Sequence, residues 1–382
     1  MTAADLEEFE EELETCFGTS CGFCERGCPV YQALKVRTLS MKGRNRTMLG
    51  LLKGKFDITP SVVKAAFECT LCGNCDRWCS LKNTEHTRAF REYLLKHGVE
   101  PMKEHSSLLA SMKNYGNPWL QPRSARGKWL RGLDIPKAAK GNQEVLFFAG
   151  CTSAVMKPLV PSLVASAKLL KRAGVDFAVI GQDEPCCGST LLRVGQTDAF
   201  EKLEKENFDR FKALGVKRIV TACPGCYTTL KKSAEKLGSD IAINHITQEI
   251  ANLIRSGDLK VEKSSEKMTY HDPCHLGRLG GIFDEPREIV DAVADLVEMP
   301  NCRYEARCCG AGAGLQSAFP RLSRELAAKK VDEAKGTGAT TLVTCCPFCE
   351  TQLKTAPGIN VVDLMQLLLE AIEKGEKKNT SG

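Results

Sequence analysis

The sequence predicts a mainly α-helical, cysteine-rich N-terminal region followed by two tandem α/β domains with mostly parallel sheets. The cysteines occupy two zones, residues 16–79 and residues 151–349. In the second zone, five cysteines recur at offsets of 122 or 123 residues, which indicates two homologous domains in succession. Inside this repeat, short β-rich runs alternate with helical patterns, as expected of βαβ units.

The composition indicates a protein of a reducing compartment that uses its cysteines chemically. A chain of 382 residues can bury enough apolar surface to fold without many disulfides, yet it contains 20 cysteines. Residues 1–15 are acidic and helix-like, unlike the basic and apolar start of a secretory signal. Clustered cysteines in reducing compartments bind metal or take part in redox reactions. We therefore expect a cytoplasmic location and an anaerobic setting.

Charge and hydropathy disfavour nucleic-acid binding and membrane insertion. The formal net charge is +6 with neutral cysteines, and metal-bound thiolates would offset part of that excess. Aromatic residues make up 6% of the chain, and no basic stripe is interleaved with them. The apolar stretch at residues 361–372 contains Asp363, Gln366 and Glu370, and it is shorter than the roughly 18 residues of a membrane span. Membrane association would therefore come through a partner subunit.

Two cysteine motifs near the N-terminus have the spacing of ligands to cubane iron-sulfur clusters. The run Cys69-x2-Cys72-x2-Cys75-x3-Cys79 matches the bacterial ferredoxin pattern, in which the fourth cysteine binds the other cluster. The earlier run has the same second half and the following proline, but two extra residues after Cys16. Zinc fits these triple-cysteine turns poorly, because it favours two separate cysteine pairs. Two cubane [4Fe-4S] clusters are therefore expected, one on Cys16, Cys21, Cys24 and Cys79 and the other on Cys28, Cys69, Cys72 and Cys75.

Helical patterns between these motifs, such as residues 61–68, predict an α-helical ferredoxin-like domain over residues 1–117. The segment 118–141 is rich in Pro, Gly, Lys and Arg, and we interpret it as a linker.

The two repeats are predicted to be Rossmann-like α/β domains at residues 142–262 and 263–382. In the first repeat, β-rich runs at 145–148, 175–180, 218–221 and 241–244 alternate with helical patterns at 162–172, 197–214 and 228–237. The repeated cysteines are Cys151, Cys186, Cys187, Cys223 and Cys226 in the first domain and Cys274, Cys308, Cys309, Cys346 and Cys349 in the second. Several of them directly follow an expected strand, where parallel sheets bind their ligands. Cys302 and Cys345 have no counterpart in the first repeat, and we expect them to be buried thiols.

A glycine-rich run after the second cysteine pair, Gly310-Ala-Gly-Ala-Gly, resembles a dinucleotide-binding loop. Two cysteines precede it in place of an apolar strand, which argues against that function. Nicotinamide, flavin or heme is therefore expected on partner subunits.

A two-cubane domain joined to two domains that each carry a Cys-Cys-Gly (CCG) motif resembles the catalytic subunit of the heterodisulfide reductase family over nearly the whole chain. The resemblance implies that each CCG domain holds a noncubane [4Fe-4S] cluster through its five cysteines, and that a disulfide is cleaved between the two clusters. The ten CCG cysteines would then be catalytic. His275, with His271 and Arg278 beside it, is a candidate for proton supply or for holding an anionic substrate.

These features predict the iron-sulfur catalytic subunit of an oxidoreductase that passes electrons through its cubanes to a small-molecule disulfide. The resemblance implies a flavoprotein, a hydrogenase-type module or a membrane cytochrome b as partner. The alternative is an electron-relay subunit of a glycolate or lactate oxidase or of a benzoyl-CoA reductase type complex. Two complete CCG motifs favour catalysis, because a relay has no evident need for ten further thiolates. A third interpretation places structural zinc in one or both CCG domains.

Overall fold

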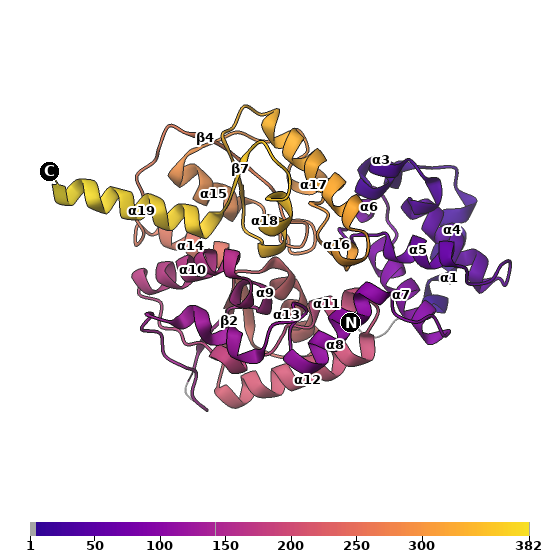
Figure 1. Cartoon of the computed structure of the whole chain (residues 1–382), viewed down its shortest axis with the longest axis horizontal. Helices are drawn as coiled ribbons and strands as arrows, with labels where there is room; N and C mark the ends of the chain where they lie inside the picture. The colour runs from indigo at the N-terminus through magenta and orange to yellow at the C-terminus, as the bar shows by residue number, and fades with distance from the viewer. Residues whose placement is uncertain (1–4, 142, 382) are drawn as a thin grey trace.

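The computed structural model describes residues 5–141 and 143–381 and confirms the predicted class: a helical region precedes two α/β domains with parallel sheets. In Figure 1 most of the helical region lies to one side, next to the last α/β domain, whereas helix α8 (Lys103–Tyr115) packs with the core of the two α/β domains. A cluster of apolar side chains joins the two, because residues of α3 and α5 pack with residues of α16 and α17.

The N-terminal region consists of short helices joined by cysteine-bearing turns. The predicted helix over residues 1–15 is found as a 3-10 turn at Leu6–Phe9 followed by α1, and residues 1–4 lie outside the described residues. The predicted helix at 61–68 is confirmed as α5, where the Thr59 side chain caps the first turn and Pro60 opens the helix. The helices are α1 (Glu10–Gly18), α2 (Phe23–Gly27), α3 (Pro29–Leu34), α4 (Met41–Leu52), α5 (Pro60–Phe67), α6 (Asn74–Arg77), α7 (Asn83–Lys96) and α8 (Lys103–Tyr115), with a further 3-10 turn at Arg37–Leu39.

The segment interpreted as a linker, 118–141, packs on the first α/β domain. Arg123–Leu130 forms a 3-10 helix, and Trp129 is buried against Phe147 with 6.2 Å between ring centroids. Arg126 donates hydrogen bonds to backbone carbonyls on both sides of this segment. The segment therefore connects the two parts of the chain and also covers one end of the first sheet.

The first repeat contains a three-stranded parallel sheet of order β1-β2-β3. Its strands are β1 (Val145–Phe148), β2 (Arg218–Thr221) and β3 (Ala242–His245), the last one residue later than predicted. The three predicted helices are confirmed within α10, α12 and α13. The helices are α9 (Cys151–Val155), α10 (Val160–Arg172), α11 (Ser189–Arg193), α12 (Thr197–Leu214), α13 (Pro224–Leu237) and α14 (Ile246–Arg255), with 3-10 turns at Lys157–Leu159 and Gly181–Asp183.

The predicted strand at 175–180 is wrong. This segment makes only two isolated parallel bridges, Ala178 with Leu146 and Val179 with Lys137. It runs beside β1, but its partners change after one residue and the chain turns away at Gly181, so no continuous ladder forms.

The second repeat contains a four-stranded parallel sheet of order β5-β4-β6-β7. Its β4–β6 register pairs Met268 with Thr341, the counterparts of the Val145–Arg218 pair in the first sheet. The strands are β4 (Lys267–Tyr270), β5 (Asp295–Leu296), β6 (Thr341–Thr344) and β7 (Asn360–Asp363). The helices are α15 (Asp284–Val293), α16 (Leu315–Ala318), α17 (Pro320–Lys335), α18 (Pro347–Leu353) and α19 (Leu364–Ser381), with a 3-10 turn at Arg303–Glu305.

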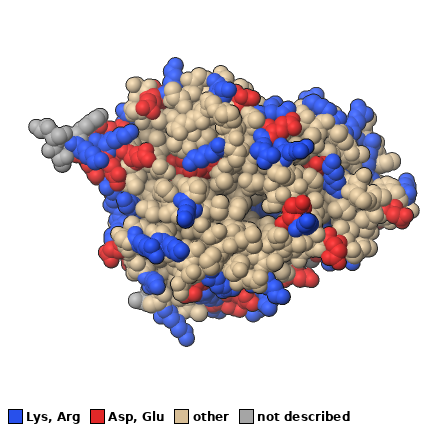
Figure 2. All heavy atoms as spheres, in the orientation of Figure 1, with Lys and Arg blue, Asp and Glu red and all other residues tan. Residues whose placement is uncertain are grey.

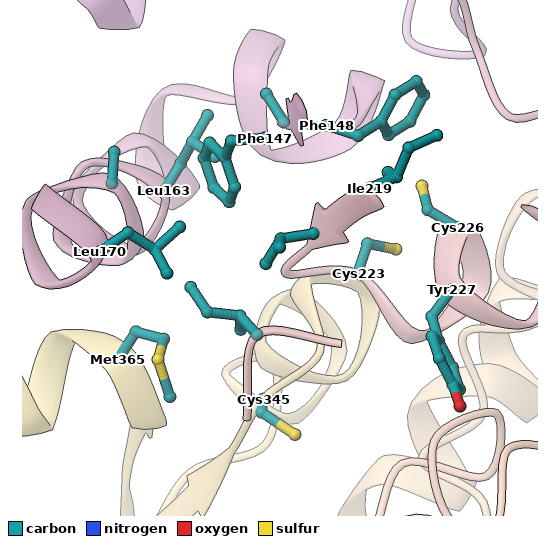
Figure 3. Packing of buried hydrophobic residues seen from close by; sticks show 14 of the residues in the cluster. Phe147, Phe148, Leu163, Leu170, Ile219, Cys223, Cys226, Tyr227, Cys345 and Met365 are labelled. Atoms are coloured by element: carbon teal, nitrogen blue, oxygen red, sulfur yellow. The ribbon is translucent and has the colours of Figure 1, made fainter. Parts of the chain in front are cut away.

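The two repeats share one hydrophobic core. Helix α10 of the first repeat packs on α19 of the second, and α14 packs on α15. Figure 3 shows Leu163 and Leu170 of α10 in the same cluster as Met365 of α19. This packing brings the carboxyl ends of the two sheets close to each other.

The described surface carries charges of both signs. Figure 2 shows Lys and Arg dispersed among Asp and Glu over one face. Within residues 5–141 and 143–381, no helix is both long and apolar enough to cross a membrane.

Candidate metal centres

One cavity between the repeats brings the CCG cysteines together. Cys151 and Cys223 follow β1 and β2, and their counterparts Cys274 and Cys346 follow β4 and β6, as the sequence predicted. The cysteines that line the cavity are Cys151, Cys186, Cys187, Cys223, Cys226, Cys274, Cys308, Cys309, Cys346 and Cys349. Thiols separated by up to 198 residues in the sequence therefore face one common space.

In the first repeat all five CCG cysteines are buried. The Sγ atoms of Cys151 and Cys186 lie 3.7 Å apart. The pKa of Cys223 is lowered, first by the Cys226 thiol and also by the amides of Cys226 and Gly225 at the start of α13. A helix N-terminus beside a thiol favours the thiolate, which is the form that binds metal.

In the second repeat, the Sγ atoms of Cys309 and Cys349 lie 3.4 Å apart, and Cys274 is partly exposed. His271, at the end of β4, has a ring nitrogen within 4.8 Å of the Cys309 and Cys349 sulfurs. Cys345 is buried, and its thiol forms a 3.0 Å hydrogen bond with the Tyr270 hydroxyl.

The two thiols without a counterpart in the first repeat therefore differ. Cys345 is a buried thiol, as predicted, whereas Cys302 is only partly buried.

The predicted residue His275 lines the shared cavity from the second repeat. Its Nδ1 lies opposite Gly225 of the first repeat, 3.8 Å from the point that a Cβ at Gly225 would occupy. The pKa of His275 is lowered well below its ordinary value, first by burial and then by Arg193. The imidazole is therefore held neutral among the protein groups that surround it.

Arg193, at the end of α11, also lines the cavity, and sequence reasoning missed it. Its counterpart in the second repeat is Leu315, so the repeat gives no signal for a functional arginine. Burial lowers the pKa of Arg193, and Cys274, Glu85, Cys187 and Cys223 partly offset that shift, so the guanidinium lies near several of the thiols.

Four of the eight N-terminal cysteines line a second, smaller cavity with Arg44. These four are Cys28, Cys69, Cys72 and Cys75. They come from two motifs 41 residues apart, and they are the set that the exchange of fourth ligands predicts. Arg44 lies within charge-interaction range of Cys28.

The other predicted set, Cys16, Cys21, Cys24 and Cys79, is more open. Cys16 is buried and Cys21 is exposed, and the Thr19 hydroxyl lies 3.4 Å from the Cys21 sulfur. The pKa of Cys24 is raised to about 11, chiefly by burial, and Cys16 contributes to the shift. Cys79 lines a neighbouring groove that also contains Asp76. Because α2 and α6 pack together, the two turns that carry this set are adjacent.

The ferredoxin-like loop that carries Cys72 lies directly against the second CCG loop. Cys72 packs with Cys308 and Cys309 in one cluster of buried side chains. Arg278 donates from Nε to the Cys72 carbonyl at 2.9 Å and from Nη1 to the Ala306 carbonyl. The structure therefore places Arg278 at this junction, and its expected part in holding an anionic substrate stays a prediction.

The donor sets fit iron-sulfur clusters. Each CCG domain offers five thiols to one space, whereas structural zinc is saturated by four ligands. Soft sulfur donors suit iron-sulfur clusters, and burial of nine of the ten CCG cysteines limits the access of water to their cavity.

Comparison with known proteins agrees with this architecture. The model of the cysteine-rich CCG domain matches residues 145–231 and 268–354, and the 4Fe-4S dicluster domain matches residues 12–83. An iron-sulfur relative from Methanosarcina acetivorans, part of its dihydromethanophenazine:CoB–CoM heterodisulfide reductase, is 32% identical, and the alignment covers 94% of each chain. The chain belongs to the heterodisulfide reductase family.

Further matches include two more relatives by sequence and one solved structure that is similar in fold. A component of the fumarate reductase (CoM/CoB) of Methanothermobacter marburgensis is 28% identical over 94% of this chain and 71% of its own length. The EtfAB:quinone oxidoreductase of Syntrophomonas wolfei is 30% identical, and the alignment covers 83% of this chain but 48% of that protein. A hypothetical protein from Helicobacter pylori, of known structure, shares the fold with a TM-score of 0.59 at 14% identity, over 96% of this chain and 76% of its own. This chain is thus an iron-sulfur oxidoreductase subunit of the heterodisulfide reductase type.

Proposed function

We propose that this chain reduces a small-molecule disulfide in the cavity shared by its two CCG domains. The observation that carries the proposal is the convergence of ten thiols, five from each repeat, on one space that also contains His275 and Arg193. A relay would need only a row of separate clusters. Two facing centres instead suit a substrate with two sulfur atoms.

The cofactors proposed are two cubane and two noncubane [4Fe-4S] clusters. The cubanes would be held by the two N-terminal sets of four cysteines, and each noncubane cluster by the five cysteines of one CCG domain. When bound, the clusters supply electrons one at a time and offer iron to the sulfur atoms of the substrate. Reduction of the disulfide consumes two electrons and two protons and yields two thiols.

The residues of the cavity would position the substrate and its sulfur atoms. Arg193 places a guanidinium where an anionic disulfide could bind, and its planar donors suit carboxylate, sulfonate or phosphate groups. His275 has a buried Nε2 without a hydrogen-bond partner among the described residues, and the neutral imidazole could donate a hydrogen bond there to a sulfur atom of the substrate.

Electrons would enter the cavity through the second CCG domain. The backbone of Thr70 lies 3.0 Å from the point that a Cβ at Gly312 would occupy, and Arg278 ties the neighbouring loops together. These contacts support a position next to the second centre for a cubane held by Cys28, Cys69, Cys72 and Cys75. The other cubane, held at the more open site by Cys16, Cys21, Cys24 and Cys79, would then receive electrons from the partner subunit.

The substrate and the partner follow from the relatives. The CoB–CoM heterodisulfide named for the Methanosarcina relatives is the substrate proposed first. A flavoprotein, a hydrogenase-type module or a membrane cytochrome b would supply electrons, and a membrane partner would attach this chain to the bilayer. The second candidate is an electron relay, which the similarity to the quinone oxidoreductase of Syntrophomonas wolfei favours.

The test is a disulfide-reductase assay with the anaerobically purified chain and reduced viologen as electron donor. We expect oxidation of the viologen on addition of the CoB–CoM heterodisulfide or of a homodisulfide, and release of two thiols per disulfide. The R193M variant should raise KM for anionic disulfides more than it lowers kcat. A chain with complete and reducible clusters that oxidises viologen with none of these disulfides would establish the relay instead.

A further inference from the structure

The two CCG centres have the same backbone but different neighbours. Equal strand registers make Phe148 of β1 the counterpart of His271, which follows β4. At three nearby positions the second repeat also has a side chain with more polar character. Phe147, Thr152 and Ala222 of the first repeat correspond to Tyr270, His275 and Cys345. The second repeat therefore carries polar groups at positions that are mostly apolar in the first, and among them His271 lies beside the cysteines. Figure 3 shows Phe147 and Phe148 within the apolar cluster of the first repeat.

His271 is fully buried, and its ring lacks partners. Its backbone amide donates to the Val343 carbonyl at 2.9 Å, which fixes the residue in line with the sheet. Neither Nδ1 nor Nε2 has a hydrogen-bond partner among the described residues, although the side chain is 0% exposed. A buried polar group without a partner destabilises the fold, so native proteins rarely retain one without a reason.

The missing partner lies in the direction of the cysteines. The sulfurs of Cys309 and Cys349 and a ring nitrogen of His271 are all within 4.8 Å of one another. Five thiolates already exceed the number of irons in one four-iron cluster, so a nitrogen ligand is not required. An imidazole N–H beside cluster sulfur can instead donate a hydrogen bond to it.

We propose that His271 donates a hydrogen bond to the sulfur of the cluster held by the second CCG domain, and that this contact gives the second cluster a higher reduction potential than the first. Hydrogen bonds to sulfur stabilise the more negative, reduced state and so raise the potential. Phe148 offers no donor at the equivalent place. The second centre would thus accept an electron first, and it is also the centre next to the ferredoxin-like loop.

His271 is a positioning and tuning residue in this account, and the proposal rests on cluster binding by the second CCG domain. It does not rest on disulfide reduction. Its test uses potentials that are measured without substrate, so a chain that reduces no disulfide can still support it.

The experiment is a redox titration of the complete, cluster-loaded chain followed by EPR, with three variants. H271F installs the residue that the first repeat accommodates, and it should shift the potential of one CCG centre to more negative values while the cubanes keep theirs. H271Q retains an N–H donor and should show a smaller shift. The reciprocal F148H variant should raise the potential of the other CCG centre.

Two results would overturn the proposal. One is an unchanged set of potentials in H271F at full iron content. The other is the strong nitrogen hyperfine coupling of a directly bound imidazole in the wild type, together with loss of iron in H271F, which would make His271 a ligand. If H271F does not assemble its cluster for another reason, H271Q and F148H decide the matter, because the first keeps the donor and the second leaves His271 in place.

Discussion

Adjacent cysteines at the end of β6 have opposite environments. The thiol of Cys346 lines the shared cavity, whereas that of Cys345 bonds to the Tyr270 hydroxyl at 3.0 Å. Side chains of successive residues leave an extended segment on opposite faces, so one sulfur can bind metal while its neighbour packs in the core.

This contrast gives a prediction for a matched pair of variants. C345A should leave the iron content and the EPR spectrum unchanged and cost about 1 kcal/mol of stability through the lost contact. C346A should lower the iron content and alter the spectrum of one CCG centre. Equal iron loss in both variants would show that Cys345 is a ligand.

Arg91 of α7 connects all three parts of the chain. Its side chain is fully buried, and it donates five hydrogen bonds to backbone carbonyls. The acceptors are Ala66, Phe67 and Cys69 in the helical region, Arg193 in the first repeat and Ala313 in the second.

We expect R91M to destabilise the chain by roughly 3 kcal/mol or more, because it leaves several buried carbonyls without donors. The measurement is anaerobic chemical unfolding followed by circular dichroism. The control is R255M, since Arg255 forms an exposed ion pair with Glu288, which should contribute about 1 kcal/mol or less. A loss in R91M no larger than in R255M would contradict this account.

At the scale of elements, Asp363 ends β7 and directly precedes α19, and it makes the stability of the folded chain depend on pH. Its carboxylate accepts hydrogen bonds from the amides of Met365 and Gln366 at 2.9 and 3.3 Å. Burial, and then the charge of Glu350, raise the pKa of Asp363 to about 7. The folded chain therefore holds a proton that the unfolded chain releases near pH 4, so this residue's contribution to stability falls as pH rises from about 4 to about 7.

The D363N variant should remove this dependence. We expect it to melt at a higher temperature than the wild type at pH 8 and to approach the wild type at pH 6, measured anaerobically by circular dichroism. D134N is the control, because Asp134 is fully exposed and stays ionised over this range. If the melting temperatures of D363N and the wild type changed in parallel with pH, Asp363 would be ruled out as the source of the pH dependence.

Element boundaries could be predicted where local chemistry defines them. The helix at 197–214 ends at Gly215, which adopts φ = 79°, and the Cys-Pro pair at 223–224 opens α13. The strand at 175–180 could not be predicted correctly, because a ladder depends on consecutive partners far away in the chain. The cysteine sets could be predicted from spacing, whereas Arg193 and Arg91 could not, since each acts across parts of the chain that are far apart in the sequence.

At the scale of the whole molecule, several contacts join the ferredoxin-like region to the second CCG domain, and on the proposed path electrons would enter the cavity there. Arg278 bonds to the Cys72 carbonyl, and Asn74 donates to the Ala306 carbonyl at 3.4 Å. Apolar contacts between α3 and α17 add to these bonds. On the proposed path, electrons would then reach the first CCG domain through the cavity.

The R278Q variant should slow electron transfer from the adjacent cubane to the second centre, because it loosens the two loops that hold them together. Stopped-flow absorbance of the prereduced chain mixed with disulfide measures this rate. R77Q serves as the control, since Arg77 pairs with the exposed Glu305 at the rim of the same junction and its loss should change the rate little. Equal rates in R278Q and wild type would place the entry elsewhere.

The central claim is that both CCG domains bind clusters that act on a disulfide. The most direct measurement is iron and labile-sulfide analysis with EPR on the anaerobic chain, before and after addition of the CoB–CoM heterodisulfide. The account predicts about sixteen irons per chain, four for each of four clusters, and a new paramagnetic signal when the disulfide is added. About eight irons per chain and a spectrum that no disulfide changes would contradict it.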